Sequence, residues 1–153
     1  MAEDKAGVRG FYRLQITDDG KVVGDSGWNE NVVVNTGFLS FLVKSLGSIS
    51  GSAYVGYMAL GTGGAPATDD TALAGEVEAR TAVTAATSAT SKTVRFTATF
   101  ASGGSFVTST QNISNIGLYA SSTGSNLFAG NTYASSSVAT NQSVNATYDI
   151  TYS

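Results

Sequence analysis

The side chains that most often carry catalysis are largely missing from this sequence. Histidine and cysteine are both absent from its 153 residues, which excludes thiol nucleophiles, imidazole bases, disulfides and the usual zinc sites. Proton transfer would have to come from carboxylates, lysine, tyrosine or serine. A glycosidase of the common kind needs two carboxylic acids that face each other across a cleft. The acidic candidates are Glu3, Asp4, Asp18, Asp19, Asp25, Glu30, Asp69, Asp70, Glu76, Glu78 and Asp149.

The two adjacent acidic pairs, Asp18–Asp19 and Asp69–Asp70, both lie in segments typical of turns. Aspartate favours turns because its carboxylate accepts hydrogen bonds from nearby backbone N–H groups. Asp69 and Asp70 also form a candidate calcium site, although the spacing of an EF-hand loop is missing. We therefore predict that these acids shape turns, that the chain holds no metal or cofactor, and that it is not an enzyme.

Two further candidate binding features are a glycine-rich segment and a set of tyrosines. Residues 61–64 are as rich in glycine as a phosphate-binding loop, but the Gly-Lys-Ser/Thr ending and a long following helix are missing. We interpret them as a turn. The tyrosines are candidates for a sugar-binding platform, but we favour a place in the core or at a subunit interface, since tyrosine is apolar with one polar end. The six candidates, among seven tyrosines in the chain, are Tyr54, Tyr57, Tyr119, Tyr133, Tyr148 and Tyr152.

The charge of the chain argues against two classes of partner. Only 12% of its residues are charged and the net charge is −3, whereas an average soluble domain has about 25% charged residues. The basic residues form no cluster, so we expect no nucleic-acid partner and no anionic membrane surface. No stretch of eighteen apolar residues occurs, and residues 1–10 lack the apolar run of a signal peptide.

The strand pattern predicts an all-β fold. The length favours one domain, with a polar N-terminal arm at 1–10 and a single sandwich at 11–153. Within it, 11–35 form a hairpin and an extended segment. Residues 93–100 and 144–152 alternate apolar and polar side chains, as half-buried strands do. Further strands are expected at 106–110, at 113–120 with a phase break near Asn115 that suggests a bulge, and at 126–130. We predict an antiparallel β-sandwich or a jelly roll.

One helix is predicted at 36–46 and a second helical turn at 71–78. In the first, Asn35 or Thr36 can cap the start and Gly47 can end it. Its apolar face consists of Phe38, Leu39, Leu42 and Leu46, which recur at helical spacing. In the second, Asp70 and Thr71 can cap the start, Leu73 and Val77 face the core, and Glu76 and Arg80 pair at i, i+4.

Two segments carry a resemblance to a known group of proteins. The first comprises residues 58–66, 70–77 and Arg80, and the second comprises residues 116–120 and 126–129. Together with the alternating C-terminal strand, they resemble small virion proteins of tailed bacteriophages, which build capsid-surface decorations or parts of the tail and its fibres. The resemblance covers roughly residues 28–153 and leaves the N-terminal hairpin outside it.

The resemblance implies a structural role on the outer surface of a virion, after synthesis in the host cytoplasm. The leading hypothesis is a capsid decoration (cement) protein that binds and stabilises the shell. The alternatives are a tail, baseplate or fibre component that binds a host receptor or glycan, and a hydrolase of cell-wall or capsule sugars. The expected partners are further copies of the chain, with a trimer favoured, and the major capsid protein. The arm at 1–10 is a candidate tether that orders on a neighbour.

Overall fold

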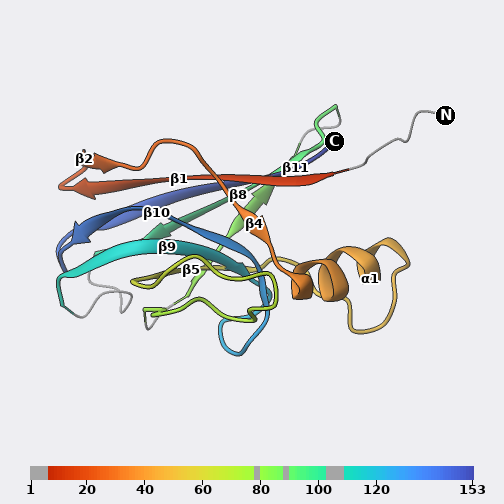
Figure 1. Ribbon diagram of the computed structural model, residues 1–153. Coiled ribbons are helices and arrows are strands. Elements are labelled where there is room, and N and C mark those ends of the chain that lie inside the picture. The colour runs from red at the N-terminus through yellow and green to blue at the C-terminus, as the bar shows by residue number, and fades with distance from the viewer. Residues whose placement is uncertain (1–6, 78–79, 88–89, 103–108) are drawn as a thin grey trace.

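The computed structural model describes residues 7–77, 80–87, 90–102 and 109–153. Within them, two antiparallel sheets pack face to face, and one short helix lies at an end of the sandwich (Figure 1). The predicted all-β antiparallel sandwich with one short helix is therefore confirmed.

Each sheet is built from strands that are distant in sequence. Sheet A has the order β2-β1-β11-β8-β7, with β3 paired to β1, and sheet B has the order β4-β10-β9-β5-β6. The strands of sheet A are β1 (Val8–Asp18), β2 (Lys21–Asp25), β3 (Asn29–Glu30), β7 (Thr84–Ala86), β8 (Thr93–Phe100) and β11 (Ser143–Tyr152). The strands of sheet B are β4 (Val32–Val33), β5 (Tyr57–Gly61), β6 (Thr81–Ala82), β9 (Gln111–Tyr119) and β10 (Leu127–Val138).

Alternation along the strands of sheet A builds the core between the sheets. Side chains two residues apart share a face of a strand, so every second residue points at sheet B. The alternation expected at 93–100 and 144–152 is confirmed in β8 and β11, except that Tyr152 at the end of β11 is exposed. The buried side chains of β1, β8 and β11 are Tyr12, Leu14, Ile16, Phe96, Ala98, Phe100, Val144, Ala146, Tyr148 and Ile150.

The predicted N-terminal hairpin is confirmed, but the predicted arm is too long. β1 and β2 pair around the turn at Asp19–Gly20. β1 begins at Val8, which pairs with Tyr152 of β11, and the Gly7 N–H donates to the Ser153 carbonyl at 3.2 Å. The arm prediction is wrong for residues 8–10 because they complete the sheet beside β11. Residues 1–6 lie outside the described residues.

The two sheets differ in how their outer faces are covered. The connection after β5 folds over the outer face of sheet B and buries a second apolar cluster, which consists of Val34, Ala59, Leu73, Tyr119 and Leu127. In Figure 1 this connection is the yellow-green chain beside β5. On the outer face of sheet A, Arg95, Thr97 and Thr99 alternate with core residues and are exposed. The outer face of sheet A is the more open and more polar of the two.

The predicted helical turn is wrong for residues 71–77, and residue 78 lies outside the described residues. Gly75 has φ +65°, which a right-handed helix does not allow. The carbonyls of Ala74 and Gly75 accept hydrogen bonds from the N–H groups of Gly63 and Thr62, so they are not available to a helix. The predicted anchoring is nevertheless confirmed: Leu73 and Val77 are buried, and Glu76 pairs with Arg80.

The C-terminal strands differ in length from the prediction. The expected strand at 113–120 is confirmed as β9, and the phase break near Asn115 is confirmed as an irregular pairing. Thr132 of β10 pairs with Asn115 of β9, and Ser136 pairs with Ile113. Three residues of β10 therefore lie opposite the single residue Ser114. The prediction that the next strand ends at 130 is wrong, since β10 continues to Val138. Of the strand expected at 106–110, residues 106–108 lie outside the described residues, and 109–110 precede β9.

The first helix is confirmed in place but not in geometry. It consists of a π-helical segment, η1 (Gly37–Leu42), followed by α1 (Val43–Leu46). The Val43 N–H donates to the Phe38 carbonyl, five residues back, as in a π-helix. The capping prediction is wrong for Thr36, whose side chain makes no capping hydrogen bond, whereas Gly47 does follow the last turn.

Candidate functional site

Four of the described carboxylates are paired with arginines. Asp25, Glu30, Glu76 and Asp149 form ion pairs with Arg13, Arg9, Arg80 and Arg95, respectively. Hydrogen bonds from Arg13, the Gly27 N–H and Gln15 hold the pKa of Asp25 well below its usual range. Because each of these acids has a basic partner, their negative charges are stabilised in place.

Both acidic pairs lie at turns, and Asp70 shapes its turn as predicted. The Asp70 carboxylate accepts a hydrogen bond from the Ala67 N–H at 2.8 Å. The Asp18 carboxylate accepts one from the Gln142 side chain at 3.4 Å. Asp69 and Asp19 are exposed. Among the described residues, no group of three acidic side chains is arranged to hold a metal ion.

The glycine-rich segment 61–64 is part of a hydrogen-bonded junction centred on Asn115. The Asn115 amide is fully buried and donates to the carbonyls of Gly64 and Ala74, at 3.1 and 2.9 Å. The Ser114 hydroxyl donates to the Gly63 carbonyl. The segment thus ties the connection after β5 to β9, and two of its N–H groups already have acceptors.

The tyrosines separate into two environments. Tyr119 and Tyr148 are fully buried, and Tyr57 and Tyr133 are partly buried. These four agree with the predicted place in the core. Tyr119 lies under the Arg80 guanidinium at 3.5 Å and donates its hydroxyl proton to Glu76 at 2.8 Å. Tyr54 and Tyr152 are exposed at the helical end of the sandwich. The six tyrosines therefore form no common platform.

The main exposed apolar surface surrounds the helix, and we call it the apolar end. Leu46 is 92% exposed and Tyr54 is 78% exposed. Large apolar side chains favour burial, and a group of them in solvent marks an interaction site. The exposed members of the apolar end are Phe38, Leu39, Val43, Leu46, Ile49, Tyr54 and Tyr152.

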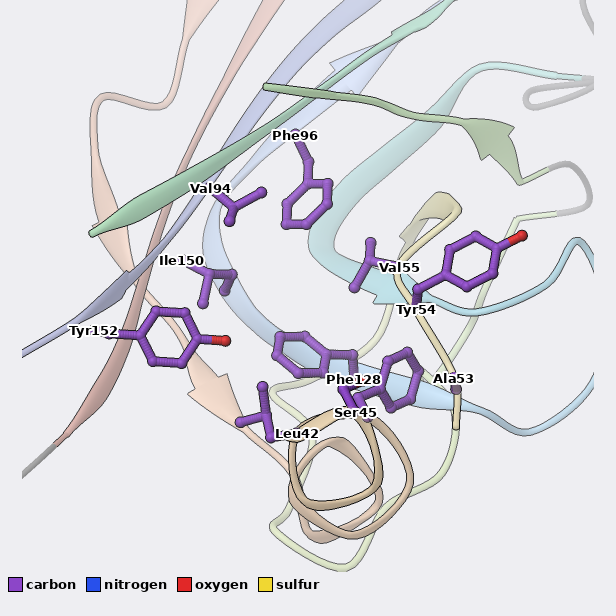
Figure 2. Close-up of a pocket in the computed structure, with 11 residues that line it drawn as sticks. Leu42, Ser45, Ala53, Tyr54, Val55, Val94, Phe96, Phe128, Ile150 and Tyr152 are labelled. Atoms are coloured by element: carbon purple, nitrogen blue, oxygen red, sulfur yellow. The ribbon is translucent and has the colours of Figure 1, made fainter. Parts of the chain in front are cut away.

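A groove of about 170 Å³ opens within the apolar end. Sheet A supplies Val94, Phe96, Ile150 and Tyr152, and the helix and the chain that follows it close the other sides (Figure 2). The Tyr152 hydroxyl points into the groove, whereas that of Tyr54 points away from it. A second depression, between the helix and Val8, shares Leu42, Ser45 and Tyr152 with the groove. The apolar end is therefore continuous from the helix to the ends of β1 and β11.

The apolar end owes its position to the π-helical segment. An α-helix would place Phe38, Leu39, Leu42 and Leu46 on one inward face, as we predicted. The wider π turn changes the direction in which successive side chains point around the helix axis. Phe41 is buried instead, against Phe128, with ring centroids 5.1 Å apart. Phe38, Leu39 and Leu46 are left in solvent, so the predicted inward face is wrong for these three.

Charge is sparse at the apolar end. Lys44 is the one charged residue in 37–57. Partial burial raises the pKa of Tyr152, so this hydroxyl adds no charge to the surface. A surface of this kind loses little hydration energy when a partner covers it.

Comparisons with protein families, curated proteins and solved structures found no match for this chain. In the described part of the chain, no helix has the length and apolar character needed to cross a membrane. The fold is a two-layer β-sandwich, and its most conspicuous surface is an apolar end built around a π-helical turn.

Proposed function

We propose that this protein is a structural component of a tailed-phage virion, a decoration protein on the outer shell, and that the apolar end is its assembly surface. The observation that carries the proposal is the gathering of exposed apolar side chains around the helix, with almost no charge among them. The resemblance to small virion proteins, carried by residues 58–66, 70–77 and Arg80 and by residues 116–120 and 126–129, supports a place in a virion. A role without catalysis agrees with carboxylates that are engaged in ion pairs and turns.

The same surface supports self-association. A lasting protein contact buries about 1,000 Å² or more, with an apolar centre and a polar rim. We propose a trimer, in which the apolar ends of three copies meet and the assembled unit sits on a symmetric shell. Closed rotational symmetry needs one such patch per copy. We keep the proposal of a tether to a neighbouring capsid protein for residues 1–6, which lie outside the described residues.

The test compares Leu46→Asp with Val23→Asp by sedimentation. Both side chains are exposed, so both variants should fold, but Val23 lies on β2, at the opposite end of the sandwich from the helix (Figure 1). We expect the unmodified chain and Val23→Asp to sediment as the oligomer, and Leu46→Asp to sediment as a monomer that no longer attaches to shells. An unmodified chain that is monomeric at high concentration and also fails to bind shells would overturn the proposal.

The alternative is a tail, baseplate or fibre component that binds a host receptor or glycan. It is favoured by one separate observation, the aromatic and polar surface around Trp28 that is described below. Electron microscopy of antibody-labelled particles distinguishes the two positions, because a decoration is labelled over the whole shell and a fibre component only on the tail.

A further inference from the structure

The chain's single tryptophan is held on the outer face of sheet A. Trp28 is 48% exposed, although tryptophan is among the side chains that gain most from burial. The turn that presents it is tied down on both sides. The Asp25 carboxylate accepts from the Gly27 N–H at 2.9 Å, and the Asn29 amide donates to the carbonyls of Ser26 and Gly27. The indole is thus exposed on a fixed support rather than on a free loop.

Polar groups of fixed geometry surround the indole. Arg95 of β8 and Asp149 of β11 are opposite each other in the sheet and form two hydrogen bonds of 2.8 Å. The Arg95 guanidinium carbon lies 5.7 Å from the centre of the Trp28 ring. The Thr93 and Thr151 hydroxyls lie 2.8 Å from each other on the same two strands. An aromatic face, an arginine, a carboxylate and two hydroxyls therefore share one area of the sheet.

Two shallow depressions give this area its shape. One lies between Trp28 and Phe11, and the other lies beside Arg95; both include Thr93 and Asp149. The second has a volume of about 370 Å³. The Arg95 side chain is 53% exposed and that of Asp149 is 15% exposed, so Arg95 is the more accessible member of the pair.

The chemistry of this area selects among ligands. A pyranose ring has a face of C–H bonds, which packs on an aromatic ring, and a rim of hydroxyl groups that both donate and accept hydrogen bonds. The indole offers the flat apolar surface, Arg95 offers donors in fixed directions, and Asp149 and the threonines offer acceptors. The charges of Arg95 and Asp149 cancel, which favours a neutral sugar. A protein partner would find here neither the continuous apolar area nor the low polarity of the apolar end.

We infer that the outer face of sheet A around Trp28 binds a neutral glycan, with one pyranose ring stacked on the indole and its hydroxyls paired with Arg95, Asp149 and the Thr93–Thr151 pair. This inference does not depend on the proposed virion role, because it rests on a different face of the sandwich.

The first experiment is a printed array of neutral bacterial oligosaccharides, with sialylated and sulfated glycans as charged comparators, probed with the full chain. The tightest neutral binder is then titrated in solution while the indole fluorescence is followed, which reports on this site alone because the chain has one tryptophan. We expect binding to neutral glycans and a change in emission on saturation. Binding restricted to the charged comparators, or no binding on the array, overturns the inference.

The second experiment uses variants, with binding measured by calorimetry. Trp28→Ala should weaken binding about tenfold or more, and Trp28→Phe should restore part of it, since it keeps a smaller ring. Val23→Ala, which removes an exposed apolar side chain of β2 away from both depressions and from the apolar end, is the control and should bind as the unmodified chain does. Equal affinity in Trp28→Ala and Val23→Ala contradicts the site. Dissociation of the oligomer in Trp28→Ala would instead show a protein interface, which also overturns the inference.

Discussion

At the scale of single residues, alternation along β8 places neighbouring side chains in opposite environments. Phe96 points into the core and is 8% exposed, whereas Thr97 points outward into solvent. Aspartate at 96 would put an unpaired charge among apolar side chains, while aspartate at 97 would stay hydrated.

We expect Phe96→Asp to cost on the order of 4 kcal/mol or more of unfolding free energy, which is a large part of the stability of a typical domain. We expect Thr97→Asp to cost less than about 1 kcal/mol. Urea denaturation followed by circular dichroism measures both. A Phe96→Asp protein as stable as Thr97→Asp would show that the face assignment of β8 is wrong.

Some residues of the candidate sites could be predicted from their neighbours in sequence and some could not. The inward residues of β1, β8 and β11 follow from local alternation. The buried Asn115 amide does not, because its acceptors lie on residues 64 and 74, distant in the chain. The surface around Trp28 was missed for the same reason. The available signal was a lone tryptophan in a polar segment, but Arg95 and Asp149 join it only through the pairing of β8 with β11.

At the scale of elements, the helix shows how the geometry of a single turn changes a whole surface. Its place in the chain was predicted correctly from apolar spacing. Its inward face was not, because the prediction assumed 3.6 residues per turn and the structure contains a π-helical segment. The close approach of Gly37 to β10 accompanies this geometry, since a Cβ there would clash with the Phe128 carbonyl oxygen.

The helix register predicts a clear difference between two substitutions. Phe41 is buried against Phe128, so Phe41→Ala should cost about 3 kcal/mol. Leu46 is almost fully exposed, so Leu46→Ala should change the free energy of unfolding by less than about 0.5 kcal/mol. Denaturation of dilute protein, where self-association is weak, measures both values. A larger cost for Leu46→Ala would support the α-helical face that the sequence pattern predicted.

The remaining element predictions failed where tertiary contacts override local pattern. Apart from Tyr133, residues 131–137 of β10 carry small and polar side chains without alternation, and they form a strand because β9 offers a partner. Residues 71–77 have a helical pattern, yet their carbonyls pair with the glycine-rich segment and with Asn115. In both places the deciding hydrogen bonds come from residues far along the chain, which no local window contains.

At the scale of the whole molecule, the sandwich presents two unlike surfaces. The apolar end has almost no charge and suits a permanent protein contact. The outer face of sheet A is polar and carries one exposed aromatic ring, which suits a soluble ligand. A chain seated by its apolar end could therefore keep the face of sheet A in solvent, and the two proposals are compatible in one particle.

A group of buried tyrosines connects the two sheets. The Tyr12 hydroxyl of β1 donates to the Thr132 carbonyl of β10, and the Tyr12 ring packs on Tyr133 and Tyr148. Burial raises the pKa of Tyr12 to about 12, and it also raises those of Tyr133 and Tyr148. An ionised hydroxyl in this junction would be a charge between the sheets, so the folded state holds these protons more tightly than the unfolded chain does.

This difference predicts alkaline unfolding with a definite sign. The unfolded chain releases tyrosine protons near pH 10, whereas folded Tyr12 releases its proton near pH 12. Between these values the folded state binds more protons, so its stability is complete below pH 10 and falls as the pH rises toward 12. Urea denaturation at a series of pH values, with tyrosinate absorbance recorded in parallel, should show stability falling as buried tyrosines ionise. Tyr12→Phe should make the fall shallower, because it removes one of the shifted groups, and an unchanged slope in that variant would mean that this junction does not set the alkaline limit.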